Sequence, residues 1–194
     1  MLKSGIEIDL YCNLESWVKI VAKKGMYISI NFLKKLHLEN LIKKISILNK
    51  NKGYGNVPIE YYSRKLLNSS KPPVFGYDMY KLLSKTKICF NIHGEIAEKC
   101  AGNMRLFEAT GLGACLVTDW KENITDLFEP GKEIITYKSA EECIEKVKWL
   151  MANPNEREKI AKAGQKRTLT SHTIENRAKL MDRIIKKALD KFIS

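Results

Sequence analysis

The sequence contains no apolar run of the roughly 18 residues that a membrane-spanning helix needs. Met1-Leu2-Lys3 is not followed by the apolar stretch and small-residue cleavage site of a secretory signal peptide, so we expect a cytoplasmic protein. The five cysteines form no Cys-x-x-Cys pair, and no two aspartates form an Asp-x-Asp pair. The cysteine spacing argues against a zinc site and a disulfide framework, and we predict no dependence on a metal or cofactor.

Positive charge, by contrast, is abundant. The 194 residues include 34 Lys and Arg against 22 Asp and Glu, which gives a net charge of +12. Residues 91–154 are acidic, with 7 basic against 11 acidic side chains, so the excess lies in the flanking segments. Such flanks attract nucleic acid, anionic lipid or phosphorylated substrates, and they also form ordinary solvated helix faces. The lysines occur as scattered pairs without a nucleic-acid-reading motif, so we do not expect nucleic acid as a partner.

From residue 74 onward, strand-like and helix-like segments alternate. The expected strands are 74–75, 87–92, 114–118 and 133–137, and the expected helices are 78–84, 103–111, 139–151 and 156–166, with a last helix from about 173. This alternation predicts an α/β fold, in which a Rossmann-like parallel sheet has helices on both faces. Ligands bind such sheets at the carboxyl ends of the strands.

The first 70 residues give weaker signals. They predict a strand at 6–11, a helix at 14–24 ended by Gly25, a strand at 26–30, a helix at 31–49 and a short helix near 60–67. We expect one domain over residues 1–194, in which 1–70 is a lead-in of strand and helices, 71–172 holds the core motifs, and 173–194 is a C-terminal helix. That helix carries an apolar stripe, which needs either the chain's own sheet or a partner to cover it.

Polar residues gather where the expected strands end and on the helix after the first of these ends. They are Asn91, His93, Asn103, Arg105, Glu108, Gly111 and Asp119. Arg105 and Glu108 are three apart and share a helix face. A guanidinium near a helix N-terminus suits a diphosphate, and a carboxylate one turn on suits a ribose diol. An ordinary intrahelical ion pair explains the same two residues.

Several separate motifs carry a family resemblance. They are Gly76-Tyr77-Asp78-Met79-Tyr80, Lys87–His93 (Lys-Ile-Cys-Phe-Asn-Ile-His), Asn103–Ala109 (Asn-Met-Arg-Leu-Phe-Glu-Ala), Gly131–Tyr137 and Asn153-Pro154-Asn155. In this order they resemble the carboxyl-terminal half of GT-B-fold glycosyltransferases, closest to the family-1-like transferases typified by the spore maturation protein CgeB. The resemblance covers about 72–185, is looser over 1–12, and is very weak over 13–70.

The resemblance implies a domain that binds a nucleotide-sugar donor. Glu108 would bind the ribose, and Asn103 and Arg105 would face the diphosphate or donor sugar. Asn91 and His93 would line the cleft, with His93 the candidate catalytic residue, and Gly111 and Asp119 would complete the donor site. The chain departs from the Glu-x7-Glu pattern of retaining transferases, because Cys100 occupies the first position.

The expected function is therefore transfer of a sugar to a glycan or lipid-linked acceptor, in cell-surface polysaccharide biosynthesis. Residues 1–70 are too short to supply the amino-terminal acceptor domain of the family. We therefore expect a fragment, a degenerate copy, or a split enzyme whose acceptor half is a separate chain, with a homodimer as the other possible partner. The basic flanks would allow peripheral contact with an anionic membrane, at its inner face. The alternative is a non-catalytic module that binds nucleotide-sugars or assembles with other chains.

Overall fold

The computed structural model describes residues 1, 4–45, 62–94 and 97–193. The chain divides into two compact units with the boundary between Pro73 and Val74. No helix in the described part of the chain is both long and apolar enough to cross a membrane. The expectation of a single domain stays a prediction, and each unit is described by itself.

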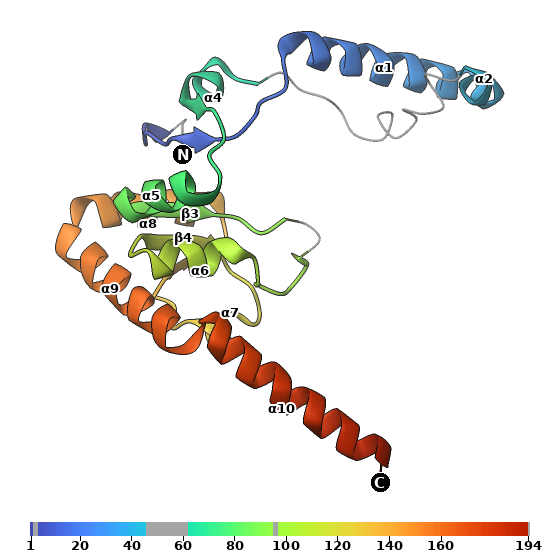
Figure 1. The fold of residues 1–194 in the computed structure, drawn as a ribbon. Coiled ribbons are helices and arrows are strands. Elements are labelled where there is room, and N and C mark those ends of the chain that lie inside the picture. The colour runs from blue at the N-terminus through green and yellow to red at the C-terminus, as the bar shows by residue number, and fades with distance from the viewer. Residues whose placement is uncertain (2–3, 46–61, 95–96, 194) are drawn as a thin grey trace. The chain divides into compact units, whose positions relative to one another are not determined.

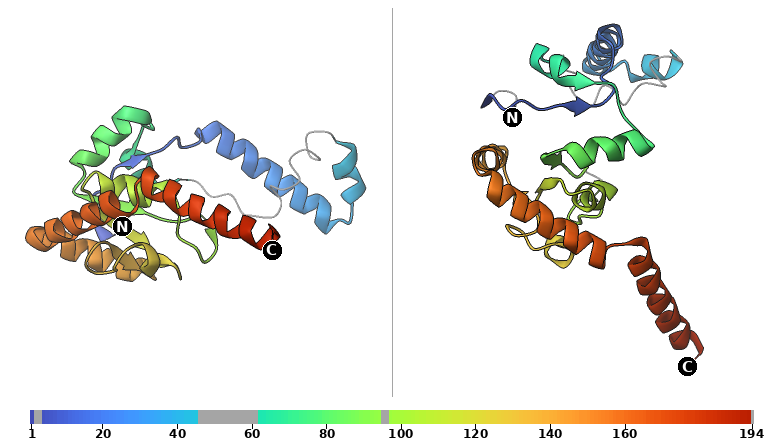
Figure 2. Two further views of the ribbon diagram at one scale, coloured as in Figure 1. Left: turned by 60° about the horizontal axis from the view of Figure 1, so that its bottom comes forward. Right: turned by 60° about the vertical axis from the view of Figure 1, so that its left-hand side comes forward.

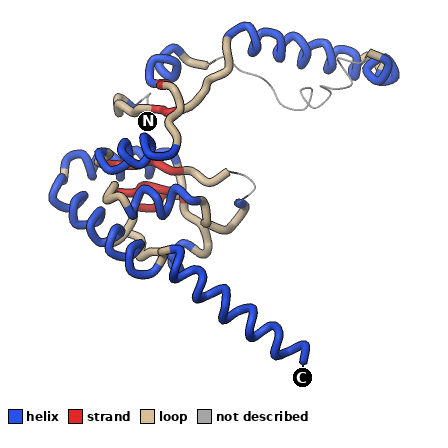
Figure 3. The backbone as a smooth tube through the Cα atoms, viewed as in Figure 1, coloured by secondary structure: helices blue, strands red, loops and turns tan. Residues whose placement is uncertain are grey.

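The carboxyl-terminal unit is built around a three-stranded parallel sheet with strand order β3-β4-β5 (Figures 1 and 3). Its elements are α5 (Gly76–Lys85), β3 (Ile88–Asn91), α6 (Met104–Gly111), β4 (Cys115–Asp119), α7 (Ile124–Leu127), β5 (Ile135–Tyr137), α8 (Ala140–Ala152), α9 (Pro154–Ser171) and α10 (Ile174–Ile193). Helix α6 lies in front of the strands in the view of Figure 1, and α8 lies behind them. The predicted parallel sheet flanked by helices is confirmed.

The core of this unit follows from the continuous apolar runs of its strands. Cys115, Leu116 and Val117 of β4 are fully buried, as a strand covered on both faces requires. Leu106 and Ala109 of α6, also with no exposed surface, belong to the same core cluster as Leu116. On this scaffold the last residues of β3 and β4 reach the same edge of the sheet.

Local signals set the helix boundaries. Ser139 caps α8 by accepting a hydrogen bond from the Glu142 N–H, as its Ser-x-x-Glu pattern predicts. Helix α6 ends in a Schellman motif, in which the amides of Gly113 and Ala114 donate to the carbonyls of Thr110 and Ala109. The left-handed residue of that motif is Gly113, with φ of 83°, and α6 ends at Gly111, where the predicted helix also ended.

The strand expected at 74–75 does not form. Phe75 is the N-cap residue of α5, and its side chain is 77% exposed. Two apolar residues before a glycine are too short a signal to separate a strand from the entry to a helix.

The amino-terminal unit contains β1 (Leu10–Tyr11), α1 (Trp17–Lys35), α2 (Glu39–Lys44), α4 (Arg64–Ser69) and β2 (Ser70–Lys71), with β1 and β2 paired in parallel. The strand predicted at 26–30 is wrong, because α1 runs through Gly25 and buries Ile20 and Ile30 on a helical face. A glycine inside a helix costs only about 1 kcal/mol, and tertiary packing outweighs it.

The single helix predicted at 31–49 is also wrong where the structure describes it. Helix α1 ends in a Schellman motif, in which His37 has φ of 56° and the amides of His37 and Leu38 donate to Lys34 and Leu33 carbonyls. Helix α2 then begins at Glu39. Residues 46–49 of the prediction lie outside the described residues.

Helices α9 and α10 are separated by a bend at His172 and Thr173 (Figure 2). The apolar stripe of α10 is not covered by the chain's own sheet. Ile174, Met181 and Ile185 are 89%, 64% and 50% exposed. The expectation that this stripe packs on the sheet is therefore wrong, and the other expectation, a partner, stays a prediction.

Candidate functional site

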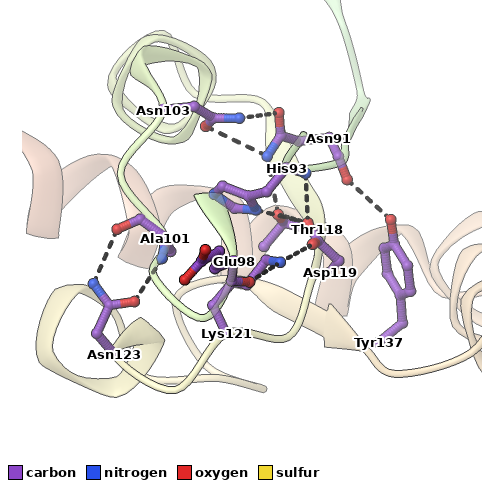
Figure 4. Close-up of polar contacts among 10 residues, drawn as sticks. All are labelled: Asn91, His93, Glu98, Ala101, Asn103, Thr118, Asp119, Lys121, Asn123 and Tyr137. Carbon is purple, nitrogen blue, oxygen red and sulfur yellow. Dashed lines mark hydrogen bonds and ion pairs between the residues drawn. The ribbon is translucent and has the colours of Figure 1, made fainter. Parts of the chain in front are cut away.

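The predicted polar residues at the carboxyl ends of β3 and β4 form a hydrogen-bonded network (Figure 4). The Asn91 amide donates to Thr118 Oγ1 at 3.0 Å and accepts from Asn103 Nδ2 at 3.0 Å. The Tyr137 hydroxyl donates to the Asn91 carbonyl at 3.1 Å. Asn91 therefore joins all three strands to the start of α6, and it is 7% exposed.

Asn103 is the N-cap residue of α6, as its position predicts, but its side chain does not cap the helix. The side-chain amide turns instead to Asn91. The first amides of α6 consequently have no cap from this side chain, which leaves the N-terminus able to receive an anion.

His93 and Asp119 form the second part of the network. Asp119 Oδ1 accepts from the His93 backbone N–H at 2.9 Å and lies 2.7 Å from His93 Nδ1. Burial opposes ionisation of Asp119, but these bonds and the nearby Lys121 ammonium lower its pKa overall. A carboxylate in this position fixes the imidazole with its proton on Nδ1.

The other ring nitrogen of His93 is isolated. Its Nε2 atom is buried and has no hydrogen-bond partner among the described residues, and the side chain is only 1% exposed. With Nδ1 protonated, Nε2 carries a lone pair and could accept a proton. It can do so only after the residues that cover it have moved.

Arg105 and Glu108 pair with each other on α6. The Arg105 Nη1 and Glu108 Oε2 atoms are 3.3 Å apart, and Arg105 Nη2 lies 3.3 Å from Met79 Sδ on α5. The Glu108 side chain is 15% exposed, and that of Arg105 is 35% exposed. The guanidinium holds the carboxylate in one orientation, so the intrahelical pair and a binding role for Glu108 are compatible.

Glu108 faces a cavity of about 450 Å³. Gly102, Met104, Phe107, Asn123 and Arg177 also line it. The Asn123 side chain holds the adjoining loop by accepting from the Ala101 N–H at 2.6 Å and donating to the Ala101 carbonyl at 2.9 Å (Figure 4). The volume is within the range of small-molecule sites.

A second cavity, of about 470 Å³, lies beside Ile135, Glu145 and Trp149. It adjoins the first residue of β5 and contains none of the predicted site residues. Parallel α/β sheets bind ligands at the opposite, carboxyl ends of their strands. The cavity beside Glu108 is therefore the stronger candidate.

The structure places Gly111 away from this cavity. Gly111 is the last residue of α6, where its carbonyl accepts from Gln165 Nε2 of α9 at 3.1 Å. Its surroundings indicate helix packing, and nothing in them supports the donor-binding role that we predicted. Glu133 Oε2 accepts from the Glu129 N–H, and Glu133 belongs to a turn.

Sequence reasoning missed Asn123, Phe107 and Arg177. Asn123 follows a strand end, and that position was a usable signal. The sequence contains no such signal for Phe107 or Arg177. Phe107 resembles a core residue, and Arg177 resembles part of a solvated helix face. His172, expected to be a surface or capping residue, ends α9 and packs its ring against Phe107.

No group of three or more His, Cys, Asp or Glu side chains in the described residues is arranged to hold a metal ion. The site therefore consists of amides, hydroxyls, one His–Asp pair, one held carboxylate and nearby cations. Such groups can bind a polar, phosphorylated ligand by hydrogen bonds and charge.

Comparison with known proteins identifies the family of this chain. Residues 31–183 match the model of a family described as glycosyl transferase-like. The chain belongs to this family. No curated protein has a sequence that matches the chain.

Solved structures give the fold. HepE from Anabaena, crystallised with UDP, is 14% identical over 93% of this chain and 48% of its own, with a TM-score of 0.56. A glycosyltransferase from Rickettsia africae is 14% identical over 94% of this chain and 47% of its own, with a TM-score of 0.54. Sucrose-phosphate synthase from Thermosynechococcus elongatus is 11% identical over 95% and 46%, with a TM-score of 0.55.

The chain thus spans about half the length of these structures and has the fold of part of a GT-B glycosyltransferase. The predicted family and fold are confirmed. The closer resemblance to CgeB stays a prediction.

Proposed function

We propose that this chain is the donor-binding half of a glycosyltransferase and that it binds a nucleoside diphosphate sugar in the cavity beside Glu108. The observation that carries the proposal is the Glu108 carboxylate, which lines a cavity of suitable volume while Arg105 holds it in place. A carboxylate accepts hydrogen bonds from both hydroxyls of a ribose. That a structure of the same fold was crystallised with UDP supports the choice of ligand.

In this proposal the other predicted residues act around the nucleotide. The uncapped N-terminus of α6 would receive negative charge of the donor, with Asn103 and Arg105 beside it. Stabilising the departing nucleoside diphosphate is the main way in which such a site accelerates transfer. Asp119 would orient His93, the candidate catalytic residue, whose Nε2 would take part once it is uncovered.

The acceptor would be a glycan or lipid-linked sugar in cell-surface polysaccharide biosynthesis. It would be bound by the acceptor half of the enzyme, which would be a separate chain or a second copy of this one. The proposed location is the cytoplasm, and the net charge of +12 supports peripheral contact with an anionic inner membrane face.

The ribose role is tested by the variant Glu108→Ala. Hydrogen bonds to a charged group contribute about 1.5–3 kcal/mol, so the variant should bind the nucleotide at least about tenfold more weakly. Calorimetry of the purified chain against UDP, GDP, ADP and CMP first selects the base. The 2′-deoxy form of the chosen nucleotide should then bind wild type more weakly than the ribose form, and this preference should shrink in Glu108→Ala.

The matched control is Glu156→Ala. Glu156 also pairs with a cation three residues later, Lys159, but on the surface of α9. The variant Glu156→Ala should leave nucleotide affinity unchanged. A folded Glu108→Ala variant with wild-type affinity and wild-type preference for the ribose form would refute the ribose role.

A second candidate function is a non-catalytic binding or assembly module. It is favoured by Cys100, which stands where retaining transferases carry a glutamate, and by the chain's half-length match to the enzymes of this fold. Turnover of a nucleotide-sugar with a glycan acceptor by this chain alone would exclude it. Nucleotide binding without turnover, even with an added acceptor half, would favour it.

A further inference from the structure

Arg177 lies on α10, yet it lines the same cavity as Glu108 of α6. Its guanidinium carbon is 5.0 Å from the centroid of the Phe107 ring, within the range of a cation–π contact. Arg177 is otherwise exposed. Its planar guanidinium has N–H groups that suit bidentate binding of a phosphate.

The Phe107 ring, which Arg177 contacts, is held in place by its neighbours. Phe107 packs against Phe128 and His172, with ring centroids 5.9 and 5.0 Å away. Phe128 has no exposed surface, and His172 Nε2 donates to the Leu127 carbonyl at 2.7 Å. Arg177 therefore lies over a ring that two further rings hold in place.

The charge of Arg177 is not compensated. Among the described residues it forms no ion pair, whereas Lys179 and Lys186 of the same helix pair with Glu175 and Asp182. Burial lowers the pKa of His172, and the nearby Arg177 lowers it further against the opposing effect of its hydrogen bond, so this imidazole adds no positive charge at neutral pH.

The cavity thus has a carboxylate that is already paired and a cation that is not. Glu108 is neutralised by Arg105, and Arg177 remains to attract an anion. Arg105 is engaged by Glu108 and reaches toward Met79, so it is less available for phosphate than the sequence suggested.

We propose that Arg177 binds the diphosphate of the donor while Glu108 binds its ribose. This inference rests on the proposed function and deepens it, because it assigns a phosphate-binding group from a different helix. It predicts that Arg177 acts on phosphate affinity and leaves the nucleoside part of the ligand unaffected.

The test measures the affinities of two ligands for wild type and two variants. Wild type, Arg177→Ala and Arg177→Lys are titrated with the nucleoside diphosphate by calorimetry and with the matching nucleoside by ligand-detected NMR. We expect Arg177→Ala to weaken diphosphate binding about 10- to 100-fold with nucleoside affinity within about twofold of wild type. Arg177→Lys should be intermediate, since it keeps the charge but loses the planar fork.

Arg183→Ala is the control. Arg183 lies on the same helix, and its Nε donates to the Lys179 carbonyl. It should leave both affinities unchanged. Equal weakening of both ligands in Arg177→Ala would overturn the proposal in favour of a packing role through Phe107, and an unchanged diphosphate affinity would overturn it outright.

The two proposals fail in different ways. Binding by wild type that depends on Glu108 and not on Arg177 refutes only the role of Arg177. Absence of nucleotide binding by wild type refutes the proposed function and this inference with it.

Discussion

Among the glycines of the described residues, Gly164 of α9 leaves the least room for an added Cβ. A Cβ built on Gly164 would lie 2.3 Å from the Glu133 carbonyl oxygen, whereas carbon–oxygen contacts are normally about 3.3–3.6 Å. The oxygen belongs to the backbone of a turn held by two hydrogen bonds, from the Glu133 N–H to Glu129 and from the Gly131 N–H to Ile134. The variant Gly164→Ala therefore forces α9 and this turn apart by about 1 Å.

The magnitude follows from two opposing effects. Overpacking costs about 1–3 kcal/mol, and here the obstacle is backbone, which favours the upper end. Alanine returns up to about 1 kcal/mol through its higher helix propensity. The net loss should be about 2 kcal/mol, which corresponds to a fall of about 5–10 °C in the melting temperature of a unit this size.

Circular dichroism melts and urea titrations measure this change, with an unchanged m-value showing that the unfolding reaction is the same. Gly111→Ala is the control at the same α6–α9 contact, because its Cβ would meet only a Thr168 methyl at 3.4 Å, an ordinary contact. Gly25→Ala is a second control, inside α1 with no atom within 4 Å. If Gly164→Ala melts at or above the wild-type temperature, the reasoning is refuted.

Two further predictions concern charge and thiols. The lowered pKa of Asp119 means that its ionised form stabilises the folded chain at neutral pH, and that this contribution is lost as the pH falls below about 4 through the depressed pKa. Asp119→Asn should therefore lower the melting temperature at pH 7 and have much less effect near pH 3. A difference in melting temperature between wild type and Asp119→Asn that does not change with pH would contradict this role. A thiol reagent should modify two cysteines rapidly, Cys12 and Cys100, because the other three are buried and burial raises the pKa of Cys115 to about 11. Five rapid equivalents from the folded chain would show that the core is open.

The order of elements from residue 76 to 193 was predictable, apart from the short helix α7, because its signals are local. The run Ala114–Thr118 is apolar at every position but the last, and it forms a buried strand. The Ser139 cap likewise acts within one helical turn. The motifs around Asn103 and Glu108 also lie within a few residues, so the family and the GT-B fold could be inferred from the amino-acid sequence alone.

The first 70 residues were less predictable. The segment 26–30 alternates in a way that fits a strand, but its residues also continue the helical face of Ile20 and Ile30. Periodicity cannot separate these two cases over five residues. Packing along the whole of α1 stabilises the helix over residues 26–30.

The sequence by itself therefore determined most helices and strands of the carboxyl-terminal unit, the family, and a set of polar residues near the strand ends. Only the tertiary structure showed that, of these residues, Glu108 alone lines the cavity. It turned Arg105 toward Glu108, placed Gly111 in a helix contact, and brought Arg177 from α10 to the cavity that Glu108 faces. The physical reason is that caps and strand runs act over a few neighbouring residues, whereas a binding cavity depends on contacts between segments far apart in the chain, which no local pattern records.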